Sequence, residues 1–153
     1  MLQVKAKVYS TLISDTDTDD PNSLASILGA LPIQHVFWHY LPSNPVYPSI
    51  IYRRLNTEQD QIFNHSTLKN PMTFELSIYD STPSPEKIDK IKDRITELFH
   101  GEEANLSDTH LHFYDASVMD DIGDSFLDAD DRWFTTLRLQ FIVIKVCDLT
   151  NNL

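Results

Sequence analysis

The chain has 153 residues and a mass of 17.6 kDa, and its 23 acidic and 12 basic side chains give a formal net charge of −11 at pH 7. This length fits a single domain spanning residues 1–153, and a hydrophobic fraction of 41% excludes disorder of the whole chain. The excess of acidic side chains argues against a protein that binds nucleic acid by neutralising phosphates, and against docking on an anionic membrane. We expect no membrane span, because no run of about 18 apolar residues is present, and no signal peptide, because the N-terminus lacks an uninterrupted apolar stretch. The single cysteine, Cys147, has no partner for an internal disulfide.

Residues 1–31 are predicted to form an N-terminal helical region that contains an acidic linker. Part of the segment 2–13 alternates like a strand, but we favour a helix because apolar residues recur at helical spacing: Val4, Val8 and Leu12. Residues 15–20 begin like an EF-hand loop, but the glycine and glutamate that such a loop needs at its sixth and twelfth positions are absent. We therefore interpret these residues as a hydrated linker. A short helix follows, with Asn22 as its N-cap and Gly29 at its end.

Five segments of the predicted core, residues 32–147, have the apolar pattern of β-strands: 35–41, 49–54, 72–79, 109–115 and 133–146. The clearest is 72–79, where apolar and polar residues alternate strictly. The last segment is apolar on both faces near its end, which predicts a central position in a sheet. Residues 56–70 are mostly polar and predict a hairpin arm that protrudes from the fold. An acidic loop, 120–131, precedes the last strand.

The clearest helix is predicted over residues 84–99. Ser84 is placed to cap this helix, and Pro85 to occupy its first position. The apolar residues of the segment form one stripe: Ile88, Ile91, Ile95, Leu98 and Phe99. The order of helices and strands predicts an α+β fold, in which an antiparallel β-sheet packs against two or three helices. Residues 148–153 are expected to form a flexible tail.

The sequence offers few residues for metal binding or catalysis. Asp108, His110 and His112 are two residues apart, so a strand would present them on one face, which is workable geometry for a metal ion. No fourth ligand is visible, and we favour a half-exposed strand face without a metal. His35 and His39 fall on a predicted strand, too far apart to chelate one ion, and are interpreted as structural. No nucleophile or cofactor loop is evident, so we expect no catalytic residue, no metal site, no cofactor and no enzymatic activity.

Five strings of residues follow one another in an order that carries a resemblance. They are YPSIIYR (47–53), MTFELSIYD (72–80), SPEKIDKIKDRI (84–95), LHFYD (111–115) and WFTTLRLQFIV (133–143). Over residues 32–146 this order resembles that of the tail-completion (tail terminator) proteins of long-tailed bacteriophages. The shared strings are patterns of strand and helix, not chemical signatures.

The resemblance implies a structural role in the tail or neck of a virion that is assembled in the cytoplasm of a bacterial host. Proteins of this family form a hexameric ring at the head-proximal end of the tail tube, stop tube polymerisation and present the surface on which the head connector docks. The implied partners are further copies of the chain, the tail tube protein and a head-completion or connector protein, with no membrane and no cofactor. Phage DNA would pass through the lumen without specific binding, because acidic subunits repel it.

A ring of this kind needs two different contact surfaces on each subunit. We expect the arm, residues 56–70, to reach across a neighbouring subunit, because a polar hairpin of that length gains little stability by itself. The residues expected to make this inter-subunit contact are Gln59, Gln61, Ile62 and Phe63.

Three alternatives stay open on the sequence. The first is a head–tail adaptor or minor tail protein of the neck with a similar build. The second is an acidic DNA-mimic inhibitor, which would need a rigid array of carboxylates. The third is a metal-dependent enzyme that would use Asp108, His110 and His112.

Overall fold

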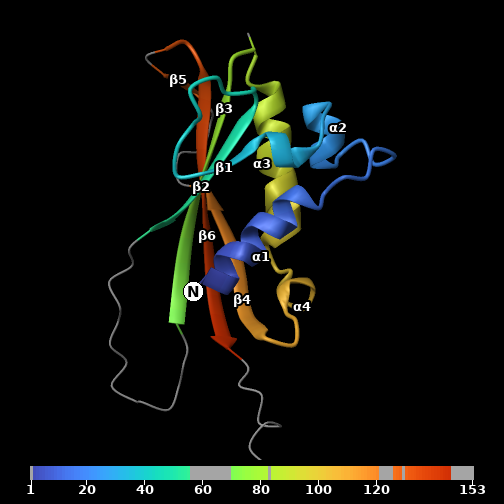
Figure 1. Cartoon of the computed structure of the whole chain (residues 1–153), viewed down its shortest axis with the longest axis vertical. Coiled ribbons are helices and arrows are strands. Elements are labelled where there is room, and N and C mark those ends of the chain that lie inside the picture. The colour runs from blue at the N-terminus through green and yellow to red at the C-terminus, as the bar shows by residue number, and fades with distance from the viewer. Residues whose placement is uncertain (1, 56–69, 83, 121–125, 129, 146–153) are drawn as a thin grey trace, which may run out of the picture.

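The computed structural model of the chain describes residues 2–55, 70–82, 84–120, 126–128 and 130–145 (Figure 1). The elements within these residues are α1 (Leu2–Ile13), α2 (Leu24–Leu28), the 3₁₀ helix η1 (Pro32–Gln34), β1 (Val36–Trp38), β2 (Ser49–Leu55), β3 (Asn70–Asp80), α3 (Glu86–Phe99), α4 (Glu103–Leu106), β4 (Leu111–Asp120), β5 (Phe126–Leu127) and β6 (Trp133–Lys145). None of the described helices is long and apolar enough to cross a membrane.

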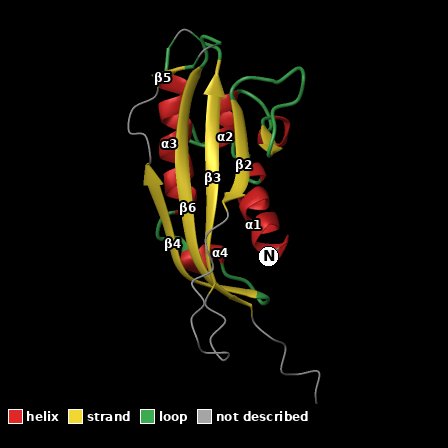
Figure 2. Cartoon of the chain, turned by 90° about the vertical axis from the view of Figure 1, so that its left-hand side faces the viewer, coloured by secondary structure: helices red, strands yellow, loops and turns green. Residues whose placement is uncertain are grey.

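The strands form one mostly antiparallel sheet in the order β1-β2-β3-β6-β4, and the short β5 pairs with β6. The strand β1 runs parallel to β2. The last strand has β3 on one side and β4 on the other, so its predicted central position is confirmed. The helices α1, α2, α3 and α4 all lie on one face of the sheet (Figure 1, Figure 2). The predicted α+β fold is therefore confirmed, and the one-turn helix α4 is an addition that the sequence did not predict.

The core lies between the sheet and the helices. Alternating residues of β3 and β6 face it and are at most 5% exposed: Met72, Phe74, Leu76, Ile78, Leu137, Leu139, Phe141 and Val143. Four residues of the predicted α3 stripe meet them and are completely buried: Ile88, Ile91, Ile95 and Phe99. The helix α1 contributes Val4, Val8 and Leu12 to the same cluster, so its helical spacing marks a buried face. Each such side chain stabilises the fold by about 1.5–3 kcal/mol.

The helix ends follow the predicted capping with small shifts. The helix α2 is capped by Ser23 and not by Asn22, because the Ser23 Oγ accepts a hydrogen bond at 3.1 Å from the N–H three residues on. Gly29 ends this helix as predicted, at a φ of 67° that residues with a β-carbon rarely adopt. The helix α3 begins at Glu86 and its N-cap is Pro85, so the predicted positions of Ser84 as cap and Pro85 as first helical residue are each one residue too early. The Glu86 N–H still donates to the Ser84 Oγ at 3.3 Å.

Two predicted strands have different bounds in the structure. The segment 35–41 is a strand only over β1, because His39 has a φ of 66° and turns the chain away from the sheet. The segment 109–115 corresponds to β4, which begins at Leu111 and continues to Asp120 past a β-bulge.

Candidate functional site

The helices leave one face of the sheet uncovered, and this face is called here the open face (Figure 2). The strand register places on this face the residues that alternate with the buried ones. Six apolar or aromatic side chains among them are buried or half-buried: Phe37, Ile51, Tyr79, Phe134, Ile142 and Ile144. A sheet face turned to water normally carries polar side chains, and this face also has them, among them Arg53, Glu75 and Arg138. The apolar side chains on either side of this polar band make the open face a candidate contact surface.

A hollow of about 350 Å³ lies on the open face near the end of β1. It is lined by His39, Ile51, Arg53, Glu75, Ser77, Tyr79, Phe134 and Thr136. The rings of Tyr79 and Phe134 stack with their centroids 4.9 Å apart. Burial raises the pKa of Tyr79 above its usual value, so its hydroxyl is a neutral hydrogen-bonding group at pH 7. The hollow thus combines one aromatic stack with mainly polar and charged lining groups.

A cross-strand ion pair lines the hollow. Arg53 on β2 and Glu75 on β3 are register partners, and the Glu75 Oε1 accepts a hydrogen bond from the Arg53 Nε at 2.8 Å and lies 2.6 Å from its Nη2. The two side chains differ in exposure, with Arg53 51% and Glu75 16% exposed. The pair therefore presents mainly its positive member to solvent.

Arg132 connects the turn before β6 to the loop between β1 and β2. Its guanidinium donates to the Tyr47 hydroxyl at 3.1 Å and to Asp128 Oδ2 at 3.0 Å, and lies 5.2 Å from the centre of the Tyr79 ring. Burial acts to raise the pKa of Asp128, but hydrogen bonds from Arg132 and from the Asp130 N–H outweigh it and lower that pKa. Asp128 and Asp130 of the acidic loop are thus held in a turn beside the open face.

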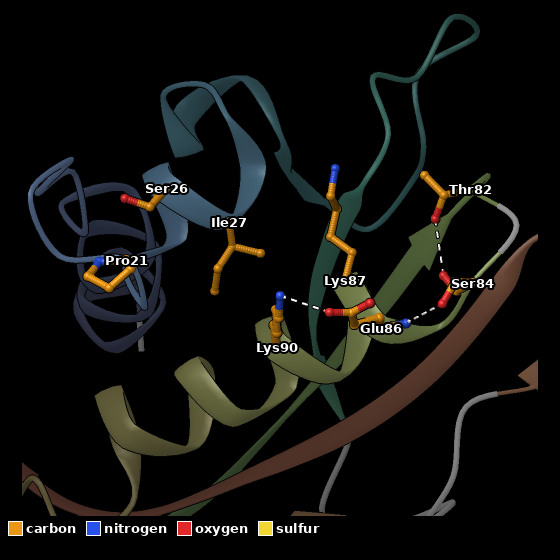
Figure 3. Close-up of a pocket in the computed structure, with 8 residues that line it drawn as sticks. All are labelled: Pro21, Ser26, Ile27, Thr82, Ser84, Glu86, Lys87 and Lys90. Atoms are coloured by element: carbon orange, nitrogen blue, oxygen red, sulfur yellow. Dashed lines mark hydrogen bonds and ion pairs between the residues drawn. The ribbon is translucent and has the colours of Figure 1, made fainter.

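A second hollow, of about 390 Å³, lies between α2 and the start of α3 (Figure 3). It is lined by Pro21, Ser26, Ile27, Thr82, Ser84, Glu86, Lys87 and Lys90. Several of its polar groups already bind one another: Lys90 pairs with Glu86 at 3.0 Å, and the Thr82 hydroxyl donates to the Ser84 carbonyl at 3.1 Å. A ligand would have to compete with these contacts, so this cleft is a weaker candidate than the open face.

The acidic linker contains a buried ion pair that no local pattern reveals. Asp15 is 9% exposed, and its carboxylate accepts hydrogen bonds from Arg94 Nη2 at 2.7 Å, from Arg94 Nε at 2.8 Å and from the Leu24 N–H at 2.7 Å. The interpretation of Asp15 as part of a hydrated linker is therefore wrong, because this residue fastens the linker to α3 and caps α2. The partners lie 79 residues apart, which is why the sequence gives no signal of the pair.

The structure does not place Asp108, His110 and His112 on one strand face. The strand β4 begins after His110, because the Asp108 Oδ1 accepts hydrogen bonds from the His110 N–H at 2.8 Å and from the next N–H at 2.9 Å and holds a turn. The Asp108 Oδ2 lies 2.8 Å from Lys7 Nζ, and this pair, with the backbone bonds, holds the pKa of Asp108 well below its usual range. The His112 ring packs edge-on against Tyr114. In the part of the chain that the structure describes, no three His, Cys, Asp or Glu side chains are placed to hold a metal ion.

His35 and His39 do not share a strand either, since one precedes β1 and the other follows it. His35 is 2% exposed, and its Nδ1 lies 2.7 Å from the Pro48 carbonyl oxygen, so this nitrogen carries a proton and donates it. His35 is thus structural, as predicted. His39 lines the hollow on the open face, which the sequence did not indicate.

The turn held by Asp108 is expected to make a measurable contribution to stability. Asp108→Ala removes both the turn bonds and the Lys7 pair, and is expected to lower the free energy of unfolding by about 1 kcal/mol, because the side chain is 38% exposed and solvent screens the pair. Asp108→Asn keeps an oxygen for the turn and is expected to cost about half as much. Urea unfolding at pH 7 measures both variants. An alanine variant as stable as the wild type would contradict this role.

Several predicted features lie outside the described residues. They are residues 56–69 of the arm, residues 121–125 and 129 of the acidic loop, Cys147 and the tail 148–153. Asn70, the last residue of the predicted arm, is the first residue of β3. The four residues expected to contact a neighbouring subunit are also outside the described residues: Gln59, Gln61, Ile62 and Phe63. Their contact stays a prediction.

Comparison of the sequence with protein-family models and with curated proteins finds no match. Comparison with solved structures finds a chain from the structure described as "Virion of native gene transfer agent (GTA) particle". The two chains superpose with a TM-score of 0.62 over 94% of this chain and 95% of that chain, at 12% sequence identity. The chain therefore shares its fold, over nearly its whole length, with a chain of that virion structure.

Proposed function

We propose that this chain is a structural protein of a phage-like virion and that it serves there as a tail terminator. In this role six copies form a ring on the head-proximal end of the tail tube, stop the growth of the tube, and offer a surface to a head-completion or connector protein. The ring stands in the neck of the particle, which is assembled in the cytoplasm of a bacterial host. The role requires neither a cofactor nor a membrane.

The likeness in fold to the gene transfer agent virion chain carries this proposal. It covers 94% of one chain and 95% of the other, so whole folds and not a shared fragment are compared. The strings that resemble tail terminator proteins overlap β2, β3, α3, β4 and β6 of this fold. The virion role is supported by the fold, and the terminator role by the resemblance of these strings.

The open face supports a role in assembly. A ring protein buries surface against copies of itself and against tube and connector proteins, and such interfaces are commonly anchored by aromatic side chains in pockets. The hollow on the open face offers the stacked Tyr79 and Phe134 for this purpose. Other apolar side chains are at least 40% exposed: Leu31, Ile33, Tyr40, Val46, Tyr114, Met119 and Leu127.

Asp108, one of the residues first considered for a metal site, has a structural role in the turn before β4. Both carboxylate oxygens of Asp108 bind other groups, one in the turn and one at Lys7. The net charge of −11 per chain also suits a ring whose lumen lets DNA pass without binding it.

The mass of the purified protein and its effect on tail tube protein test this proposal. We expect light scattering after gel filtration to give six times the chain mass, and negative-stain images to show rings. Tail tube protein of the same particle, polymerised with the chain, is expected to give shorter tubes that are capped at one end. A chain that stays monomeric and leaves tube growth unchanged would refute the terminator role. Binding to the head connector without binding to the tube would instead assign the chain to the neck as an adaptor.

A further inference from the structure

The two outer strands of the sheet differ in length. The sheet ends in β1 on one side and in β4 on the other. The strand β1 has three residues, whereas β4 has ten. An outer strand carries a row of backbone N–H and C=O groups with no strand beside them, and another chain can add there as a further strand. A short strand such as β1 offers little to such a partner, but β4 is long enough to pair with one.

Side chains of the segment 100–108, called here the guard segment, occupy the outer edge of β4. The guard segment contains the one-turn helix α4 and lies beside β4 (Figure 1). Alternate N–H groups of a strand point to opposite sides, and four N–H groups on the outer side of β4 donate to side chains of the guard segment. The pairs are Leu111 with Asp108 Oδ1 at 2.9 Å, Phe113 with Ser107 Oγ at 2.9 Å, Ala116 with Glu103 Oε1 at 3.2 Å and Val118 with His100 Nδ1 at 3.1 Å.

The guard segment imitates an antiparallel strand without being one. As the donor advances along β4, the acceptor steps back along the guard segment, as it would in an antiparallel pair. Two backbone bonds add to the side-chain bonds: the Gly101 N–H donates to the Ala116 carbonyl, and the Asp108 N–H to the Leu111 carbonyl, both at 2.9 Å. Because the middle of the guard segment is helical, it takes the bonding groups of β4 and offers no strand edge in return.

Packing holds the guard segment in place independently of its bonds to β4. Leu106 of α4 is 2% exposed and belongs to the hydrophobic core. Three of the side-chain acceptors, His100, Glu103 and Ser107, can be truncated without touching this anchor or the turn held by Asp108. The bonds to the edge of β4 can therefore be removed separately from the packing of the segment.

We propose that the outer edge of β4 is a strand-docking edge for a second copy of the chain, and that the guard segment keeps this edge closed. A second copy fits because two β4 edges related by a two-fold axis run antiparallel and match N–H with C=O groups. Tyr114 and Met119, 55% and 40% exposed, would add cross-strand contacts between the copies. This inference goes beyond the proposed function, since it concerns the chain in the absence of any virion partner.

Removing three acceptors of the guard segment tests the proposal. The open-edge variant carries His100→Ala, Glu103→Ala and Ser107→Ala. Amides of residues 111–120 are expected to exchange with deuterium about tenfold faster than in the wild type, as measured by mass spectrometry. In sedimentation velocity the variant is expected to form a species larger than the wild-type one, in an amount that rises with concentration. The single variant Glu103→Ala, which loses only one of the bonds, is expected to show both changes to a smaller degree.

Two further variants separate an open edge from a loosened fold. The lysine variant adds Tyr114→Lys and Met119→Lys to the open-edge variant, because lysine on an edge strand opposes strand addition. It is expected to keep the fast exchange and to lose the larger species, although the added lysines reduce the net negative charge of each copy. The matched control, Glu102→Ala with Asn105→Ala, removes a polar pair that bonds within the guard segment, and is expected to leave exchange and mass unchanged.

The combined results decide for or against the closed edge. Fast exchange together with a larger species that the lysines abolish supports it. Wild-type exchange in the open-edge variant overturns it, as does fast exchange without a larger species. A larger species that persists in the lysine variant also overturns it, because the edge of β4 is then not the contact. These measurements use the chain alone, so their outcome is independent of whether the chain caps tail tubes.

Discussion

Replacing Asp15 by asparagine is expected to lower the free energy of unfolding by about 3 kcal/mol. The carboxylate is 9% exposed and accepts two hydrogen bonds from the Arg94 guanidinium, at 2.7 and 2.8 Å, and a third from the Leu24 N–H at 2.7 Å. Asparagine keeps one oxygen but turns an N–H₂ group toward a guanidinium, which has no acceptor. The Arg94 side chain, 18% exposed, then lacks the partner that offsets the cost of its burial.

The cost of this substitution is expected to depend on pH. Burial acts to raise the pKa of Asp15, but the hydrogen bonds from Arg94 and Leu24 and the Arg94 charge outweigh it, so the pKa in the folded state lies below the usual value of 3.8. A carboxyl group whose pKa is lowered by folding stabilises the fold fully above its unfolded-state pKa, and this stabilisation is lost as the pH falls through the folded-state pKa. The difference between wild type and variant is therefore expected to be constant above about pH 5 and to shrink in stronger acid.

Urea unfolding at pH 7 and at acidic pH measures both effects. The matched control is Glu97→Gln, which removes the other close partner of Arg94, at 3.0 Å. Because the Glu97 side chain is 60% exposed, the control is expected to cost no more than about 0.5 kcal/mol. Equal costs for the two variants, or a cost of Asp15→Asn that persists unchanged in acid, would contradict the buried ion pair.

Local patterns were sufficient to predict most of the elements. The alternation over 72–79 and the apolar stripe of 84–99 depend on the period of a strand or a helix, which a short window of sequence contains. The same holds for Gly29, whose missing β-carbon permits the backbone that ends α2. Over residues 2–13 the pattern of apolar residues fits both a strand and a helix. The helix is correct, because its apolar side chains pack against a core whose other residues come from strands distant in the sequence.

Contacts between distant segments were not predictable in this way. The pairs Asp15–Arg94 and Asp120–Lys92 depend on how the helices lie on the sheet, and the pair Arg53–Glu75 depends on the pairing of β2 with β3. The apolar second face of the last strand was visible in the sequence and was interpreted as burial on both sides. In the structure Ile142 and Ile144 alternate with the core residues Phe141 and Val143 and so lie on the open face, which makes this pattern a sign of the candidate contact surface.

Deleting residues 59–66 is expected to leave a folded monomer and to abolish the ring. The strands β2 and β3 pair up to Leu55 and Thr73, and the six residues that remain between the two strands, 56–58 and 67–69, are enough to join an antiparallel pair. The free energy of unfolding is therefore expected to change little, since loop length has a small effect on stability. The ring is lost because the deletion removes the residues predicted to contact a neighbour.

Two substitutions within the arm separate an effect of sequence from one of length. The double substitution Ile62→Ser with Phe63→Ser removes the apolar pair of the arm. The mass measured by light scattering is expected to fall from that of the ring to that of a single chain almost as fully as in the deletion variant. The reason is that burial of these two side chains would supply most of the contact energy. Gln59→Ala with Gln61→Ala is the matched control, and is expected to weaken the ring only partly, since polar groups at an interface exchange protein contacts for water. An intact ring from the deletion variant would show that the arm is dispensable for assembly.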